Sequence, residues 1–224
     1  MKSNIQGWRE LHSRLRYYDT HPNYVKKDSR VDGDLALIAS FLLRQDWNVA
    51  VIGAGYGRET ALIAPSVRKV FAIDVRETIP HLRAFLGKRE IRNVVEVDAE
   101  NWRDGIQEDG RPVPIDFVYS IVTFQHLTRD LVRDYIEGFF PFLAPRGVFL
   151  AQFSESPTGT HDAENAAVEP NVRWTREEIS DLVKGAGYSW LTIRTISGIG
   201  GTRVKKPWIW NWSFFGRDPD TEKI

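Results

Sequence analysis

The chain has 224 residues, a length that suits one domain with a substantial hydrophobic core. Its 30 basic residues balance 30 acidic residues, which argues against a partner held mainly by bulk electrostatics, such as duplex DNA or an anionic membrane. The absence of cysteine excludes disulfides, thiolate metal ligands and a cysteine nucleophile. The first residues are polar and unlike a signal peptide, and the apolar runs are too short to span a bilayer, so we expect a cytoplasmic protein.

The segment ahead of the first predicted strand, residues 1–44, is expected to form an N-terminal helical cap. Residues 8–15 suit one helix, and residues 34–43 suit a second. An aromatic and polar break around a proline separates the two helices and carries Tyr17, Tyr18, His21 and Tyr24. Packing of the helices and closure over a bound molecule explain this segment equally well.

A buried strand, a glycine-rich turn and a helix follow the cap. Residues 48–52 form an apolar run that is typical of a strand buried on both faces in a parallel sheet. Gly53, Gly55 and Gly57 come next at alternate positions, and a helical pattern resumes at Glu59. Without Cβ atoms the turn can approach a ligand closely, and the helix N-terminus offers N–H groups to a polar or anionic group.

The glycine pattern distinguishes this turn from two other nucleotide-binding motifs. The dinucleotide fingerprint requires a third glycine where Arg58 stands, and the Gly-Lys-Ser/Thr of a P-loop is absent. Gly-x-Gly-x-Gly after a first strand resembles motif I of the class I S-adenosylmethionine (SAM) dependent methyltransferases. The resemblance implies that the cofactor contacts Gly53, Ala54, Gly55 and Gly57.

The second predicted strand, residues 69–75, carries an acidic residue near its end. Asp74 follows Gly53 at roughly the spacing of the acid that binds an adenosine ribose, and its carboxylate can accept hydrogen bonds from both vicinal hydroxyls. An aspartate in this position is often only a turn former. Strand, glycine turn, helix and acid together favour the binding role, and the resemblance also places Val75 in the cofactor site.

The third predicted strand and its exit, residues 93–102, provide a second acid. The resemblance implies that Asp98 contacts the amino group of adenine and that the backbone amide of Ala99 reaches a ring nitrogen. Trp102 could supply an apolar face beside the base. By itself, Asp98 would more often be a turn residue.

The fourth predicted strand and its loop occupy residues 115–127. Ligands of open α/β sheets bind at the carboxyl ends of the strands, so the segment from Ser120 to His126 should face the site of methyl transfer. It resembles motif IV of the family but lacks the Asn/Asp-Pro-Pro-Tyr/Phe signature, which argues against methylation of DNA bases. We expect Ser120 to contact the cofactor and Gln125 the acceptor, while His126 is a candidate general base or a structural residue.

The C-terminal part is predicted from its turns and its aromatic pattern. A helix over residues 128–143, with Thr128 as N-cap, precedes a fifth strand over residues 148–153. The polar connection after it carries a second candidate catalytic pair, His161 and Asp162. The next helix opens with a predicted capping box formed by Thr175 and Glu178. A sixth strand over residues 188–196 and an aromatic antiparallel strand over residues 208–217 complete the sheet.

The resemblance as a whole implies one doubly wound, seven-stranded α/β domain, mostly parallel, with an antiparallel C-terminal strand. The SAM-binding domain should cover residues 45–217, with a tail over residues 218–224. The implied cofactor is S-adenosyl-L-methionine, with S-adenosyl-L-homocysteine (SAH) as product. We expect O-methylation of a sugar, glycan or other metabolite, with no DNA or membrane partner, a possible homo-oligomer and no metal, since no metal-ligand spacing is evident. The alternatives are N-methylation of a small molecule or protein, non-catalytic SAM binding and, last, an NAD-dependent oxidoreductase.

Overall fold

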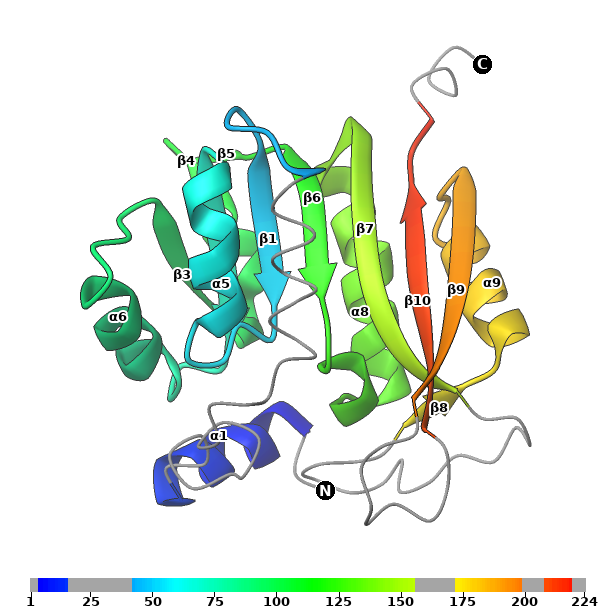
Figure 1. Ribbon diagram of the computed structural model, residues 1–224, viewed down its shortest axis with the longest axis horizontal. Coiled ribbons are helices and arrows are strands. Elements are labelled where there is room, and N and C mark those ends of the chain that lie inside the picture. The colour runs from blue at the N-terminus through cyan, green and yellow to red at the C-terminus, as the bar shows by residue number, and fades with distance from the viewer. Residues whose placement is uncertain (1–3, 16–41, 156–171, 199–207, 219–224) are drawn as a thin grey trace. The chain divides into compact units, whose positions relative to one another are not determined.

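The computed structural model describes residues 4–15, 42–155, 172–198 and 208–218. Its main sheet is built from β1 (Asn48–Ile52), β2 (Lys69–Asp74), β3 (Val94–Asp98), β6 (Ile115–Ser120), β7 (Leu143–Glu155), β8 (Arg173–Trp174), β9 (Trp190–Gly198) and β10 (Trp208–Gly216). These strands are hydrogen-bonded in the order β3-β2-β1-β6-β7-β10-β9, with β8 beside β7 (Figure 1). The predicted mostly parallel sheet with an antiparallel C-terminal strand is confirmed. The chain divides into two compact units, an N-terminal unit Met1–Ile115 and a C-terminal unit Asp116–Ile224.

The N-terminal unit is organised around three parallel strands. β1 pairs with β2, and β2 pairs with β3, in a register that places Asp74 opposite Asp98. Every residue of β1 is buried, which explains its unbroken apolar sequence. The helices of this unit are α1 (Asn4–Leu15), α5 (Arg58–Ile63), α6 (Ile79–Gly87) and α7 (Trp102–Gly105), with 3-10 turns η1 (Ala64–Ser66) and η2 (Ala99–Asn101) and a small hairpin of β4 (Gln107–Glu108) and β5 (Arg111–Pro112). In Figure 1, α1 lies at the end of the unit where β1 finishes.

The C-terminal unit packs aromatic side chains between its strands and helices. Its helices are α8 (Arg129–Phe139) and α9 (Arg176–Gly185), with 3-10 turns η3 (Phe124–His126) and η4 (Phe140–Phe142). β10 pairs antiparallel with both β7 and β9, as its alternating aromatics predict for an edge or penultimate strand, and it is the penultimate one. Phe149 of β7 stacks on Phe215 of β10 with ring centroids 4.7 Å apart, and Phe139 of α8 meets Phe149 edge to face. These rings form the core of this unit.

Several predicted boundaries are wrong. The helix after Thr128 ends at Phe139 rather than residue 143, because a 3-10 turn containing Pro141 follows, and proline cannot donate the next helical hydrogen bond. Thr128 occupies the N-cap position, but its side chain makes no capping bond. β7 begins at Leu143, before the predicted start of the fifth strand at residue 148, and the short strand β8, Arg173–Trp174, was not predicted.

The capping box of α9 is confirmed. The Glu178 N–H donates to Thr175 Oγ1 at 3.2 Å, and the Thr175 N–H donates to Glu178 Oε2 at 2.8 Å. Most of the predicted second helix, residues 34–43, lies outside the described residues. None of the helices in the described segments is long and apolar enough to cross a membrane.

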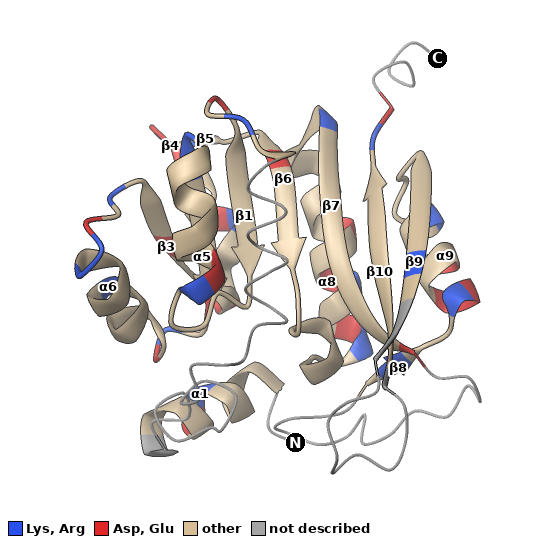
Figure 2. Cartoon of the chain, in the orientation of Figure 1, with Lys and Arg blue, Asp and Glu red and all other residues tan. Residues whose placement is uncertain are grey.

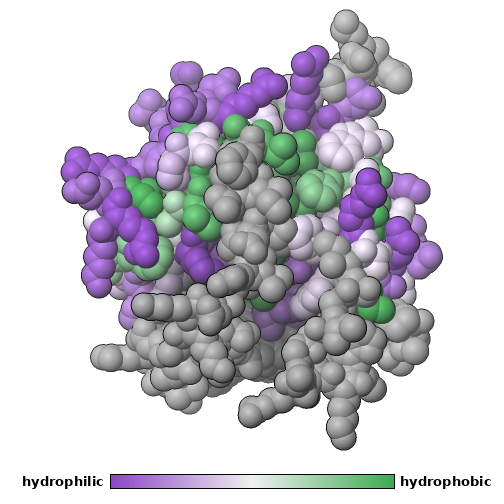
Figure 3. Space-filling view, viewed as in Figure 1, coloured by the Kyte–Doolittle hydropathy of each residue, from purple (hydrophilic) through white to green (hydrophobic). Residues whose placement is uncertain are grey.

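The surface of the described residues is mixed in character. In Figure 2, basic and acidic segments are interspersed along the helices and loops of each unit. On the face drawn in Figure 3, hydrophilic residues lie mainly along the margins, with hydrophobic and near-neutral residues between them. This distribution agrees with the formal net charge of +0.

Candidate cofactor site at the strand ends

The glycine turn between β1 and α5 adopts backbone angles that require glycine. Gly53, Gly55 and Gly57 have φ values of 75°, 54° and 93°, in the left-handed region that other residues rarely adopt. A Cβ on Gly57 would also lie 2.5 Å from Leu82 Cδ1 of α6. The Gly53 N–H donates to the Ile73 carbonyl of β2 at 2.9 Å, which holds the turn against the neighbouring strand end.

Asp74 links the glycine turn to the end of β2. The Gly55 N–H donates to Asp74 Oδ2 at 2.7 Å, and the Val75 N–H donates to Asp74 Oδ1 at 2.8 Å. Burial raises the pKa of Asp74, while these hydrogen bonds and one from Thr78 act in the opposite direction. A carboxylate has about four lone-pair sites, so both oxygens keep capacity for ribose hydroxyls.

The turn after Asp74 is fixed by Thr78. Its hydroxyl donates to the Val75 carbonyl at 2.7 Å, and its N–H donates to the same oxygen at 2.9 Å. Thr78 is fully buried and Val75 is 6% exposed. The two hydrogen bonds from Thr78 therefore fix the backbone at Val75, the residue next to Asp74.

Asp98 stands at the end of β3, next to Asp74 in the strand register. The Glu100 N–H donates to Asp98 Oδ1 at 3.1 Å, so the side chain caps the 3-10 turn η2. Ala99 and Trp102 are buried behind it, and the Arg103 guanidinium lies 4.4 Å from the Trp102 ring centroid. The N-terminal unit thus brings its predicted cofactor-binding residues to one end of its strands; these are Gly53, Ala54, Gly55, Gly57, Asp74, Val75, Asp98, Ala99 and Trp102.

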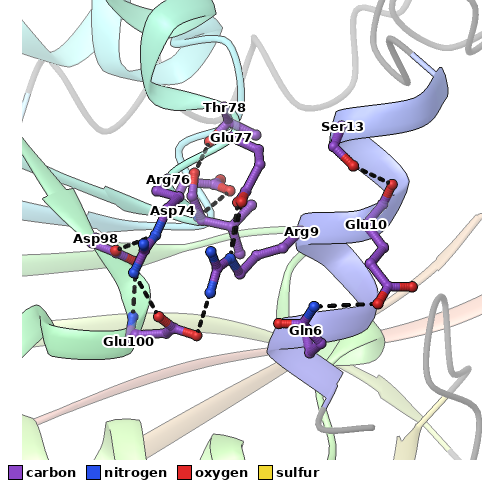
Figure 4. Close-up of polar contacts among 11 residues, drawn as sticks. Gln6, Arg9, Glu10, Ser13, Asp74, Arg76, Glu77, Thr78, Asp98 and Glu100 are labelled. Atoms are coloured by element: carbon purple, nitrogen blue, oxygen red, sulfur yellow. Dashed lines mark hydrogen bonds and ion pairs between the residues drawn. The ribbon is translucent and has the colours of Figure 1, made fainter.

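Four charged residues that sequence reasoning missed surround the two aspartates (Figure 4). Arg76 Nε donates to Asp98 Oδ2 at 3.1 Å, and Arg76 Nη2 donates to Glu100 Oε2 at 2.9 Å. Arg9 of α1 donates from Nη1 to Glu100 Oε1 at 2.8 Å and from Nε to Glu77 Oε1 at 3.0 Å. Three of them follow within three residues of the acids at the predicted strand ends, which is a signal in the sequence; these are Arg76, Glu77 and Glu100.

The helix α1 also carries a buried histidine. His12 is 7% exposed and stacks on Trp8 with ring centroids 5.9 Å apart. Burial, together with the nearby His81 of α6, lowers the pKa of His12 to about 4, and Glu77 opposes this shift. His81 in turn stacks on Tyr56 of the glycine turn at 4.5 Å. Within this unit, α1 therefore depends on a neutral histidine as well as on the Arg9 ion pairs.

The end of β6 in the C-terminal unit has a strained backbone. Val122 has a φ of 58°, which is rare for a β-branched residue. The Val122 N–H donates to Gln152 Oε1 of β7 at 2.8 Å, and Gln152 is buried. Ser120 is fully buried, and its hydroxyl has no hydrogen-bond partner among the described residues. Strain of this kind often marks a functional loop.

Gln125 and His126 lie together on η3. The amide nitrogen of Gln125 and Nε2 of His126 are 2.9 Å apart. Gln125 is 8% exposed, and its Oε1 has no partner among the described residues. Which ring nitrogen of His126 carries the proton therefore depends on the orientation of the Gln125 amide.

Arg129 joins three elements of the C-terminal unit. Its Nη2 donates to Glu178 Oε2 at 3.1 Å and to the Arg173 carbonyl at 2.6 Å, and its guanidinium lies 4.1 Å from the Trp174 ring centroid. These contacts hold α8, β8 and the N-terminus of α9 together. The sequence pattern gave no indication of this role.

The other predicted site residues, Tyr17, Tyr18, His21, Tyr24, His161 and Asp162, lie outside the described residues. Within the part of the chain that the structure describes, no three His, Asp or Glu side chains converge as metal ligands.

The strand order, the glycine turn and the paired aspartates define the fold of the class I SAM-dependent methyltransferases. Neither the protein-family models nor the curated proteins contain a match to this sequence. Solved structures do match over most of the chain. One is a 1,6-didemethyltoxoflavin-N1-methyltransferase from Burkholderia thailandensis with bound 1,6-didemethyltoxoflavin and SAH, at 18% identity over 97% of this chain and 92% of its own, with a TM-score of 0.66.

Two further solved structures show how varied these neighbours are. The DhpI-SAH complex matches at 16% identity over 97% of this chain and 98% of its own, with a TM-score of 0.63. An rRNA methylase from Streptococcus thermophilus matches at 16% identity over 87% of this chain and 99% of its own, with a TM-score of 0.55. At this level of identity the similarity establishes the shared fold.

Proposed function

We propose that the chain is a SAM-dependent methyltransferase. The observation that carries this proposal is the pair of carboxylates at the ends of adjacent strands, Asp74 and Asp98, beside a glycine turn whose Gly55 N–H donates to Asp74. The first carboxylate suits the ribose hydroxyls, and the second suits the amino group of adenine. The presence of SAH in similar structures supports the same cofactor.

The charges around the two aspartates disfavour a dinucleotide. The carboxylates of Asp74, Glu77, Asp98 and Glu100 lie at this end of the strands, and the guanidinium groups of Arg9 and Arg76 are already paired with three of these acids. NAD would bring two phosphates into this acidic surrounding, whereas SAM has none and carries a positive sulfonium. The charge balance therefore supports SAM.

Calorimetric titration with SAM, SAH and NAD tests the cofactor. We expect micromolar binding of SAM and SAH and no binding of NAD. Binding of NAD alone would contradict the proposal. Binding of SAM without methyl transfer to any acceptor would favour a non-catalytic SAM-binding protein.

For the acceptor we propose a small polar metabolite, such as a sugar or a glycan, that is methylated on oxygen. The balanced composition and the interspersed charges support a small acceptor over a nucleic acid. The small-molecule methyltransferase among the similar structures is consistent with this class of acceptor. Transfer of a radiolabelled methyl group to panels of sugars, glycans, small amines and RNA would distinguish O-methylation, N-methylation and RNA methylation.

For catalysis we propose His126 as the group that accepts the proton of the hydroxyl. A methyl transfer is an in-line displacement, so the enzyme mainly positions the acceptor, and a hydroxyl acceptor gains from a nearby base. Gln125 lies within hydrogen-bond distance of the His126 ring and would set its tautomer. The pair His161 and Asp162 is the second candidate.

A further inference from the structure

Arg76 and Asp98 belong to a continuous chain of charged groups at the strand ends of the N-terminal unit (Figure 4). Starting from Asp98, the chain runs through Arg76, Glu100 and Arg9 to Glu77, and each neighbouring pair is joined by an ion pair of 2.8 to 3.1 Å. Acidic and basic groups alternate, so every charge lies beside an opposite one.

The Asp98 carboxylate is held at both of its oxygens. The Glu100 N–H donates to Oδ1, and Arg76 Nε donates to Oδ2. With both oxygens engaged, the carboxylate cannot rotate freely about its Cβ–Cγ bond. Its remaining lone pairs keep fixed directions, and they can only accept hydrogen bonds.

Arg76 is itself held in place by a second acid. Its Nη2 donates to Glu100, and the other oxygen of Glu100 accepts from Arg9 of α1. An isolated exposed ion pair contributes little because long side chains must be ordered to form it. Here one guanidinium spans two acids, and one of these is braced from α1, so the network keeps Arg76 directed at Asp98.

We propose that Arg76 is a positioning residue that makes the site selective for a base with an exocyclic amino group. This inference rests on the proposed function, because it concerns the base of the SAM cofactor. A fixed carboxylate accepts from the 6-amino group of adenine and repels a carbonyl oxygen at the same position. Without Arg76, the Asp98 side chain can turn away from either group, and the selectivity falls.

The test is a binding comparison of SAH with S-inosylhomocysteine, the analogue in which oxygen replaces the 6-amino group. The variants are Arg76→Ala and, as a matched control, Arg83→Ala. Arg83 makes a similar pair with Glu96 of β3, with Nε donating to Oε1 at 3.1 Å, but Glu96 does not lie at the strand end. Both arginine side chains are more than half exposed, so neither substitution should prevent folding.

In the wild type we expect SAH to bind much more tightly than the inosyl analogue. Arg76→Ala should weaken SAH binding about tenfold and should not weaken binding of the inosyl analogue, because the carboxylate can then turn away from its carbonyl oxygen. The affinity ratio should therefore fall by at least about tenfold. Arg83→Ala should leave the ratio unchanged. An equal loss for both ligands in Arg76→Ala, or no loss for either, would overturn the inference, while SAH binding by the wild type would still support the proposed function. If the wild type binds neither ligand, the proposed function fails and the inference falls with it.

Discussion

The strand ends of the two units differ in how their polar groups are satisfied. In the N-terminal unit, both oxygens of Asp74 and both oxygens of Asp98 accept hydrogen bonds from the protein itself. In the C-terminal unit, several polar atoms near the strand ends are buried without a hydrogen-bond partner among the described residues; they include Ser120 Oγ, Gln125 Oε1, Glu155 Oε2 and Trp174 Nε1. The N-terminal unit also has such an atom, Thr60 Oγ1, but it lies in α5 rather than at a strand end. A buried polar atom without a partner is costly, so these atoms suit ordered water or a polar ligand.

This difference is consistent with the two proposed roles, binding of the cofactor by the N-terminal unit and binding of the acceptor by the C-terminal unit. A cofactor site gains from groups that are oriented before the ligand arrives, because less ordering is needed on binding. An acceptor site is specific when its polar groups are satisfied only by the right ligand. The comparison predicts different responses to substitution in the two units.

The largest expected effect is on turnover, from a change in the C-terminal unit. If His126 accepts the proton of a hydroxyl, His126→Ala should lower kcat about a hundredfold or more. The affinity for SAM should change little, because the contacts of Asp74 remain. Steady-state kinetics with calorimetry of SAM measures both. Gln125→Leu is the companion variant, with a smaller loss of kcat from a less well-defined tautomer, and unchanged turnover in His126→Ala would make that residue structural.

The N-terminal unit should respond in the opposite way, through cofactor affinity. Asp74→Ala removes the proposed acceptor of the ribose hydroxyls and the partner of the Gly55 N–H, so we expect SAM affinity to fall about a hundredfold, or roughly 3 kcal/mol. Titration calorimetry measures this loss, and Asp104→Ala, an exposed acid on α7, is the control. Affinity equal to the wild type in Asp74→Ala would refute the assignment.

The arrangement of this candidate site in the N-terminal unit was largely predictable because its signals are local in sequence. The apolar run of β1 predicts a strand buried on both faces, and an acid at a strand end predicts a carboxylate at the edge where ligands bind. The aromatic alternation of β10 likewise predicted its antiparallel pairing. In each case the pattern and the structural role occupy the same few residues.

The parts that were missed depend on distant or silent features. Arg9 reaches Glu77 and Glu100 from a helix far away in the chain, so no spacing could reveal the pairing. Val122 has a positive φ, yet a valine gives no turn signal. The end of α8 was misplaced because the apolar residues after Phe139 continue the helical pattern, although Pro141 is a stop signal.

The pH dependence of the free energy of unfolding tests the contribution of His12 in α1. Because the folded-state pKa of His12, about 4, lies below its ordinary value of 6.5, the unfolded chain binds the proton more readily. The stability that depends on a neutral His12 is therefore complete above about pH 6.5 and is lost as the pH falls toward 4. We expect the free energy of unfolding to be about 2 kcal/mol lower at about pH 5 than at about pH 7.5 from this group alone.

Urea unfolding of the wild type and of His12→Phe at both pH values isolates that contribution. Phenylalanine keeps a ring beside Trp8 but cannot take up a proton. His81 adds repulsion to a charged His12 and Glu77 adds attraction, and both remain in the variant. The pH-dependent difference should therefore shrink in His12→Phe; an identical pH dependence would show that His12 does not titrate in this way.

The smallest expected effect tests whether the loop after β6 stores strain. A β-branched residue at positive φ costs about 1–3 kcal/mol, and glycine relieves that cost. Val122→Gly should therefore change the free energy of unfolding by less than about 1 kcal/mol, since relief of strain offsets the lost packing and the greater freedom of the unfolded chain. Val148→Gly in β7 removes a similarly half-buried valine from extended backbone and should cost about 2 kcal/mol. If the two variants lose equal stability, the backbone at Val122 stores no strain, and the loop after β6 is not distinguished by strain from the strand ends of the N-terminal unit.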